Sequence, residues 1–63
     1  MRVILFVRDL KTEEQAEKLR VALSDTRLNF SVKPKDHIVV IEGDADGVYT
    51  AKVTIREAGF IIE

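Results

Sequence analysis

The chain has 63 residues, of which 46% are hydrophobic and 33% are charged, so it can form one soluble domain with a small core. Ten Lys and Arg residues balance eleven Asp and Glu residues, and the net charge of −1 argues against nucleic acid as a partner, because phosphate-binding surfaces carry a basic excess. No cysteine is present, which excludes disulfides, thiolate metal ligands and thiol catalysis, and favours a cytoplasmic location.

The first half of the chain reads as strand, helix and strand. The continuous run Val3–Val7 of β-branched and aromatic residues predicts a central strand. Thr12 and Gln15 fit a capping box, in which a hydroxyl and an amide satisfy backbone groups at a helix start, and this helix is predicted to end near Ser24–Asp25. The alternation in Leu28–Lys33 predicts an edge strand with one solvent-facing side.

The second half repeats a strand and a helix. Pro34–Asp36 predicts the turn of a hairpin, and the apolar run Ile38–Ile41 predicts a second central strand. Gly43–Gly47 breaks that strand and offers caps for a second helix, whose apolar period runs from Val48 to Ala58. Gly59 then stands as its C-terminal cap.

A short strand at Phe60–Ile62 completes the predicted order β-α-β-β-α-β. We therefore predict an α+β, ferredoxin-like sandwich with a four-stranded antiparallel sheet in the order 4-1-3-2. Right-handed crossovers place both helices on one face of the sheet. No linker or repeat divides residues 1–63, which predicts a single domain.

Neither a membrane span nor a signal peptide is expected. The longest apolar runs, Val3–Val7 and Ile38–Ile41, are too short to cross a bilayer, so a membrane is not an expected partner. Met1 leads almost directly into the first run and leaves no room for a signal peptide.

Three segments of the sequence carry a resemblance to a known family. Val7–Gln15 joins a strand to a helix, Ala22–Leu23 follows near the end of that helix, and Ala58–Phe60 precedes the last strand. In these segments the chain resembles the heavy-metal-associated domains of copper chaperones and metal-pumping ATPases, which have Gly-Met-Thr-Cys-x-x-Cys, then Ala-Leu, then Ala-Gly-Tyr. The resemblance covers nearly the whole chain and implies the same fold.

The metal-binding cysteines of that family are replaced in this sequence. Thr12 and Gln15 stand at the two cysteine positions, and Asp9 stands at the glycine of the motif. Copper(I) requires soft thiolate or thioether ligands, and the only sulfur here is that of Met1. The resemblance therefore implies the scaffold and the family's docking on partner domains, without its metal transfer, and a metal ion is not an expected partner.

Two interpretations of the first loop remain open. Thr12 and Gln15 can form a capping box, with the neighbouring acidic residues placed there by the helix dipole. They can also be the remnant of a metal site that binds a hard ion weakly, together with three carboxylates, Asp9, Glu13 and Glu14.

His37 is the only histidine of the chain and follows Asp36 at the start of the third strand. One imidazole and one carboxylate are too few ligands for a tight transition-metal site, so we expect an exposed hairpin residue at the same end of the sheet as the first loop. No Ser-His-Asp set, phosphate-binding glycine loop or convincing carboxylate pair is found, and we expect neither catalysis nor a cofactor.

The two central strands are apolar on both sides, although helices can cover only one face of the sheet. By analogy with the family, four side chains are predicted to point to the helices: Leu5, Val7, Val39 and Ile41. Five would then form an apolar patch on the open face: Ile4, Phe6, Ile38, Val40 and Ile61. Such a patch marks an interface, or else an apolar face that a small protein tolerates.

The sequence therefore predicts a small non-enzymatic binding module that acts through protein contacts, either with a protein partner or as a homodimer. The alternative is a metal-binding or metal-transport-related domain with weak non-thiolate ligands near the first loop.

Overall fold

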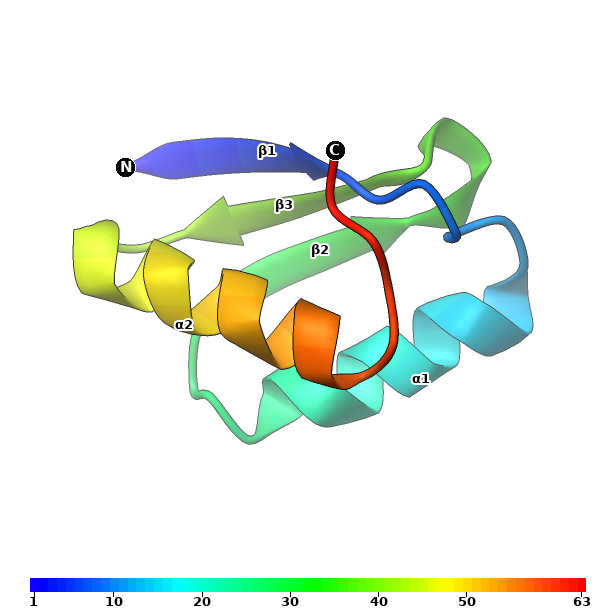
Figure 1. Cartoon of the computed structure of the whole chain (residues 1–63). Coiled ribbons are helices and arrows are strands. Elements are labelled where there is room, and N and C mark those ends of the chain that lie inside the picture. The colour runs from blue at the N-terminus through cyan, green and yellow to red at the C-terminus, as the bar shows by residue number, and fades with distance from the viewer.

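The computed structural model describes residues 1–63, and none of its helices is long and apolar enough to cross a membrane. Figure 1 shows two layers, a three-stranded antiparallel sheet and two helices that pack on one of its faces. The elements are β1 (Arg2–Phe6), α1 (Glu13–Ser24), β2 (Asn29–Lys33), β3 (Ile38–Glu42) and α2 (Ala45–Glu57), with a 3₁₀ turn at Pro34–Asp36. The α+β class and the order of these elements agree with the prediction.

The sheet has the order β1-β3-β2, so β3 is its central strand. On one side of β3, Val3 pairs with Ile41, and on the other side Phe30 pairs with the same residue. β2 is therefore an edge strand, as the alternation of its residues predicted.

The fourth strand, predicted at Phe60–Ile62, does not form, and this part of the prediction is wrong. The segment makes one isolated bridge, between Val7 and Ile62, beyond the end of β1. The Phe60 side chain is buried in the core, which holds the segment near the helices until it reaches the sheet at that point. In Figure 1 the segment, drawn in red, runs from the end of α2 to the end of β1.

Helix α2 begins three residues before its apolar period. The Asp44 side chain caps it by accepting a hydrogen bond from the Gly47 N–H at 2.8 Å. The helix therefore starts at Ala45, and Gly47 lies in its first turn. The break between β3 and α2 is shorter than the predicted Gly43–Gly47.

The other end of α2 is closed as the sequence predicted. Gly59 has a φ of 95°, a left-handed conformation that glycine adopts without a steric penalty. Its N–H donates to the Arg56 carbonyl at 3.0 Å, and the Phe60 N–H donates to the Ile55 carbonyl at 3.3 Å. These two bonds form a Schellman motif, which satisfies carbonyls at the helix end and turns the chain back toward the sheet.

The core lies between the sheet and the helices and consists only of apolar side chains. The four residues predicted to point inward are buried in it: Leu5 of β1, Val39 and Ile41 of β3, and Val7, which directly follows β1. The helices contribute one stripe each, made by Ala16, Leu19 and Leu23 in α1 and by Val48, Ala51 and Ile55 in α2. No polar side chain is buried.

Candidate functional site

In the first loop, the Thr12 and Gln15 side chains bond to the backbone of the helix start. The Gln15 N–H donates to Thr12 Oγ1 at 3.2 Å, and Gln15 Oε1 accepts from the N–H groups of Thr12 at 3.2 Å and Lys11 at 2.8 Å. The capping box predicted from the sequence is confirmed. Both side-chain oxygens are thus occupied with backbone donors of their own helix.

His37 lies against the same loop. Its Nδ1 is 2.6 Å from the Leu10 carbonyl oxygen. A carbonyl only accepts, so this contact needs a proton on Nδ1, which leaves Nε2 as the unprotonated nitrogen of the neutral ring. The expected position, exposed and at the same end as the first loop, is confirmed, whereas the bond itself links residues 27 apart and has no signal in the sequence.

Acidic residues near the start of α1 form ion pairs on the surface of the helix. Glu13 accepts a hydrogen bond from Arg20 at 2.9 Å, and Glu17 accepts one at 3.2 Å. The bond to Glu13 is the main cause that raises the pKa of Arg20 above its usual value. Since arginine stays protonated in proteins in any case, this cluster provides no pH switch.

The candidate ligands Asp9, Thr12, Glu13, Gln15 and His37 are not brought together as a metal site. No three His, Asp or Glu side chains gather as a metal ion would need. Asp9 is half-buried in the loop, and Glu14 is exposed on the helix surface.

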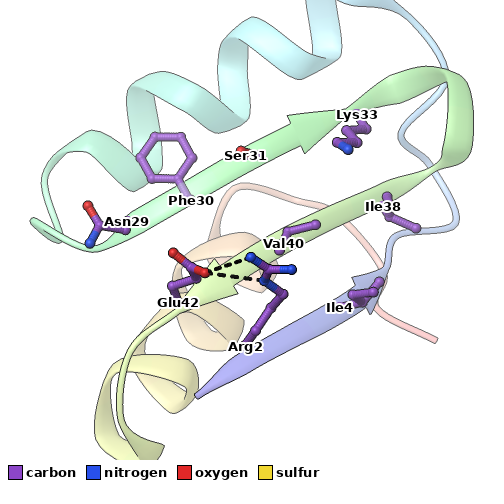
Figure 2. Close-up of a pocket in the computed structure, with 9 residues that line it drawn as sticks. All are labelled: Arg2, Ile4, Asn29, Phe30, Ser31, Lys33, Ile38, Val40 and Glu42. Atoms are coloured by element: carbon purple, nitrogen blue, oxygen red, sulfur yellow. Dashed lines mark hydrogen bonds and ion pairs between the residues drawn. The ribbon is translucent and has the colours of Figure 1, made fainter.

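The open face of the sheet consists of three rows of side chains, because the register places alternate residues of the three strands opposite one another. From β1 through β3 to β2 the rows are Arg2–Glu42–Asn29, Ile4–Val40–Ser31 and Phe6–Ile38–Lys33. Figure 2 shows the first two rows and part of the third, with the strands in front of the helices. The apolar side chains lie on β1 and β3, and the β2 positions are polar.

The predicted outward patch is on this face. Phe6 is 56% exposed, Ile4 51% and Ile61 49%, while Ile38 and Val40 are half-buried. Ile61 alternates with Ile62, which packs against the core, and so faces the same side as Phe6. Five apolar side chains therefore share one uncovered surface across β1, β3 and the C-terminal segment.

A shallow groove of about 390 Å³ crosses the face between β1 and β2. At one end, Arg2 donates two hydrogen bonds to Glu42 Oε1, at 3.1 and 3.2 Å, drawn as dashed lines in Figure 2. These polar neighbours of the patch were not identified from the sequence. They lie at alternate positions of adjacent strands, so they can be predicted to be neighbours only when the register of the strands is known.

A comparison with known proteins supports the fold. No protein-family model and no curated protein matches this sequence. Among solved structures, the chain is similar to the NMR structure of a heavy metal binding protein from Thermotoga maritima, with a TM-score of 0.85 and 23% identity over 100% of this chain and 92% of that chain. This likeness shows a shared fold, the fold that the resemblance in the sequence implied.

Proposed function

We propose that this chain is a small non-enzymatic binding module that docks on a protein through its open sheet face. The observation that carries the proposal is the exposed patch of Ile4, Phe6 and Ile61, which continues over the half-buried Ile38 and Val40. Single exposed apolar residues are common, but a patch that crosses adjacent strands is typical of an interaction surface.

The layout of the face supports this proposal. Apolar side chains form its centre, and Arg2, Glu42 and Lys33 lie at its border, which is the usual anatomy of a protein interface. Covering the exposed half of Ile4 or Phe6 would contribute about 1 kcal/mol each. Several such residues together suit a specific contact of moderate affinity.

Site-specific photocrosslinking tests the proposal. A photoreactive benzoylphenylalanine replaces Phe6 in one variant and Tyr49, an aromatic residue exposed on α2, in the matched control. In extracts of the native host we expect a covalent protein adduct from position 6 and none from position 49. Mass spectrometry then shows whether the adduct is a second copy or another protein. Adducts from both positions, or from neither, would contradict docking through this face.

A metal-related function is the second candidate, because the chain shares its fold with a heavy metal binding protein. The one available imidazole nitrogen near the first loop is His37 Nε2. With a single imidazole and no thiolate, binding of copper(I) or zinc should be no tighter than micromolar. A titration that finds a nanomolar site with one ion per chain, abolished by His37→Asn, would favour the metal function over docking.

A further inference from the structure

The outer edge of β1 carries backbone groups with no partner in the chain. The Val7 N–H donates to the His37 carbonyl at 2.8 Å, and the Met1 carbonyl accepts from the Gly43 N–H at 2.9 Å. Odd-numbered residues of β1 therefore direct their backbone groups to β3. Because these groups alternate in direction along a strand, those of the even-numbered residues point away from the sheet.

The C-terminal segment uses only part of this edge. The Glu63 N–H donates to the Phe6 carbonyl at 2.8 Å, and the Arg8 N–H donates to the Ile61 carbonyl at 2.9 Å. The hydrogen bonds outside the regular elements include none from Arg2 or Ile4. Two N–H and two C=O groups, those of Arg2 and Ile4, thus remain open on the part of the edge that the C-terminal segment does not reach.

The opposite edge of the sheet differs in chemistry. On β2 the outward backbone groups are those of Phe30 and Val32, and the strand ends in Lys33 followed by Pro34. Lysine and proline at an edge discourage pairing with another strand. The β1 edge, with the apolar run Val3–Phe6, has neither.

We propose that β1 pairs antiparallel with β1 of a second copy of this chain about a two-fold axis. Val3 then lies opposite Val3 of the second copy, and Arg2 lies opposite Ile4 of the second copy. The two three-stranded sheets become one continuous sheet, and the pairing goes beyond the docking proposed above because it uses backbone groups and not the open face.

The register follows from which groups are free. Pairing centred on Val3 uses all four backbone groups of Arg2 and Ile4 in each copy. A register centred on Ile4 would place Arg2 beside Phe6, where Glu63 already lies. A register centred on Arg2 would set two like charges opposite each other, which destabilises a strand pair.

The pairing leaves the open face uncovered and enlarges its apolar patch. Pairing at β1 would place Ile4 and Phe6 of both copies on one continuous face, since these residues lie next to the shared edge.

Backbone methylation tests the pairing without altering any side chain. In a chemically synthesised chain, N-methylation at Ile4 removes the N–H that would bond to the second copy. Each dimer loses two hydrogen bonds, so the dissociation constant measured by sedimentation equilibrium should rise roughly thirtyfold. N-methylation at Val32, which blocks an outward N–H of β2, should leave it unchanged. An unmodified chain that stays monomeric at millimolar concentration, or equal effects at the two edges, would overturn the proposal.

A cysteine variant tests the register. Residues at a non-hydrogen-bonded antiparallel pair have Cα atoms about 4.5 Å apart, within the range of a disulfide. The chain has no cysteine of its own, so Val3→Cys should give a disulfide-linked dimer on mild oxidation, whereas Val32→Cys should stay mostly monomeric. Failure of Val3→Cys to cross-link faster than Val32→Cys would overturn the proposed pairing. Because both tests leave Phe6 in place, their failure is distinguishable from a failure of docking through the open face.

Discussion

In the first loop the polar side chains that define the helix start already bond within the chain, whereas on the open sheet face the large apolar side chains are covered by nothing. Thr12 and Gln15 bond to backbone groups, and His37 contacts the Leu10 carbonyl. Phe6, in contrast, leaves 56% of its surface exposed. Groups satisfied within the fold explain stability, and groups left uncovered are the ones available to a partner.

The same contrast distinguishes a likeness in fold from a likeness in the chemistry of a site. The chain shares its fold with a heavy metal binding protein over its whole length, and Thr12 and Gln15, which the resemblance in the sequence sets at the family's two cysteine positions, form a helix cap here. A shared fold therefore does not by itself carry the chemistry of a site.

The largest expected effect comes from returning thiols to the first loop. Thr12→Cys with Gln15→Cys should raise copper(I) affinity at least roughly a hundredfold, equivalent to about 2.7 kcal/mol. Backbone donors and the helix dipole at α1 favour the thiolate form, which is the soft ligand that copper(I) prefers. Competition with a copper(I) chelator measures the gain over the unmodified chain.

The control for that variant places two cysteines away from a helix start. Thr50→Cys with Thr54→Cys adds the same thiols to the interior of α2, and its gain should be smaller. If the first-loop variant folds but gains nothing, adding Asp9→Gly restores the residue type of the family motif. No gain in that triple variant either would mean that Thr12 and Gln15 do not stand at the family's ligand positions.

The next effect concerns the cap itself. Thr12→Ala removes the oxygen that accepts from the Gln15 N–H, and it should lower the free energy of unfolding by about 1 kcal/mol. Urea denaturation followed by circular dichroism measures the loss. Thr50→Ala is the matched control, because its hydroxyl bonds only to the Asp46 carbonyl within the helix, and alanine is the better helix former there. Equal stability of Thr12→Ala and the unmodified chain would contradict the structural role assigned to the loop.

Local signals in the sequence predicted the parts of the fold that depend on neighbouring residues. The capping box at Thr12 and the end of α2 at Gly59 follow from short motifs, and the structure confirms them. The inward set of the two central strands was predicted by analogy with the family, and these residues are buried as expected. The fourth strand was predicted wrongly, because the prediction used only the strand-forming residues of Phe60–Ile62. How many of these residues can pair with the chain beside them depends on the burial of Phe60 in the core, and only one bridge forms.

The candidate site also has features that were predicted and features that were not. The outward positions of Ile4 and Phe6 were predicted, because alternation leaves two possible sets and the analogy with the family selected this one. The contact between His37 and Leu10 and the ion pair of Arg2 with Glu42 were not, because each joins residues far apart in sequence. Such pairs depend on register and turn geometry, for which one sequence has no local signal.

The smallest expected effect tests whether the open face is dispensable for folding. Phe6→Ala should lower the free energy of unfolding by only about 0.5 kcal/mol, because the side chain is more than half exposed and loses mainly its cross-strand contact with Ile38. Leu5→Ala, one residue away and 5% exposed, is the matched control and should cost about 2–5 kcal/mol. Urea denaturation of both variants, at a concentration at which sedimentation equilibrium finds only monomer, measures the difference. If the Phe6 variant loses as much stability as the Leu5 variant, the exposed ring supports the fold and the open face cannot be assigned to binding.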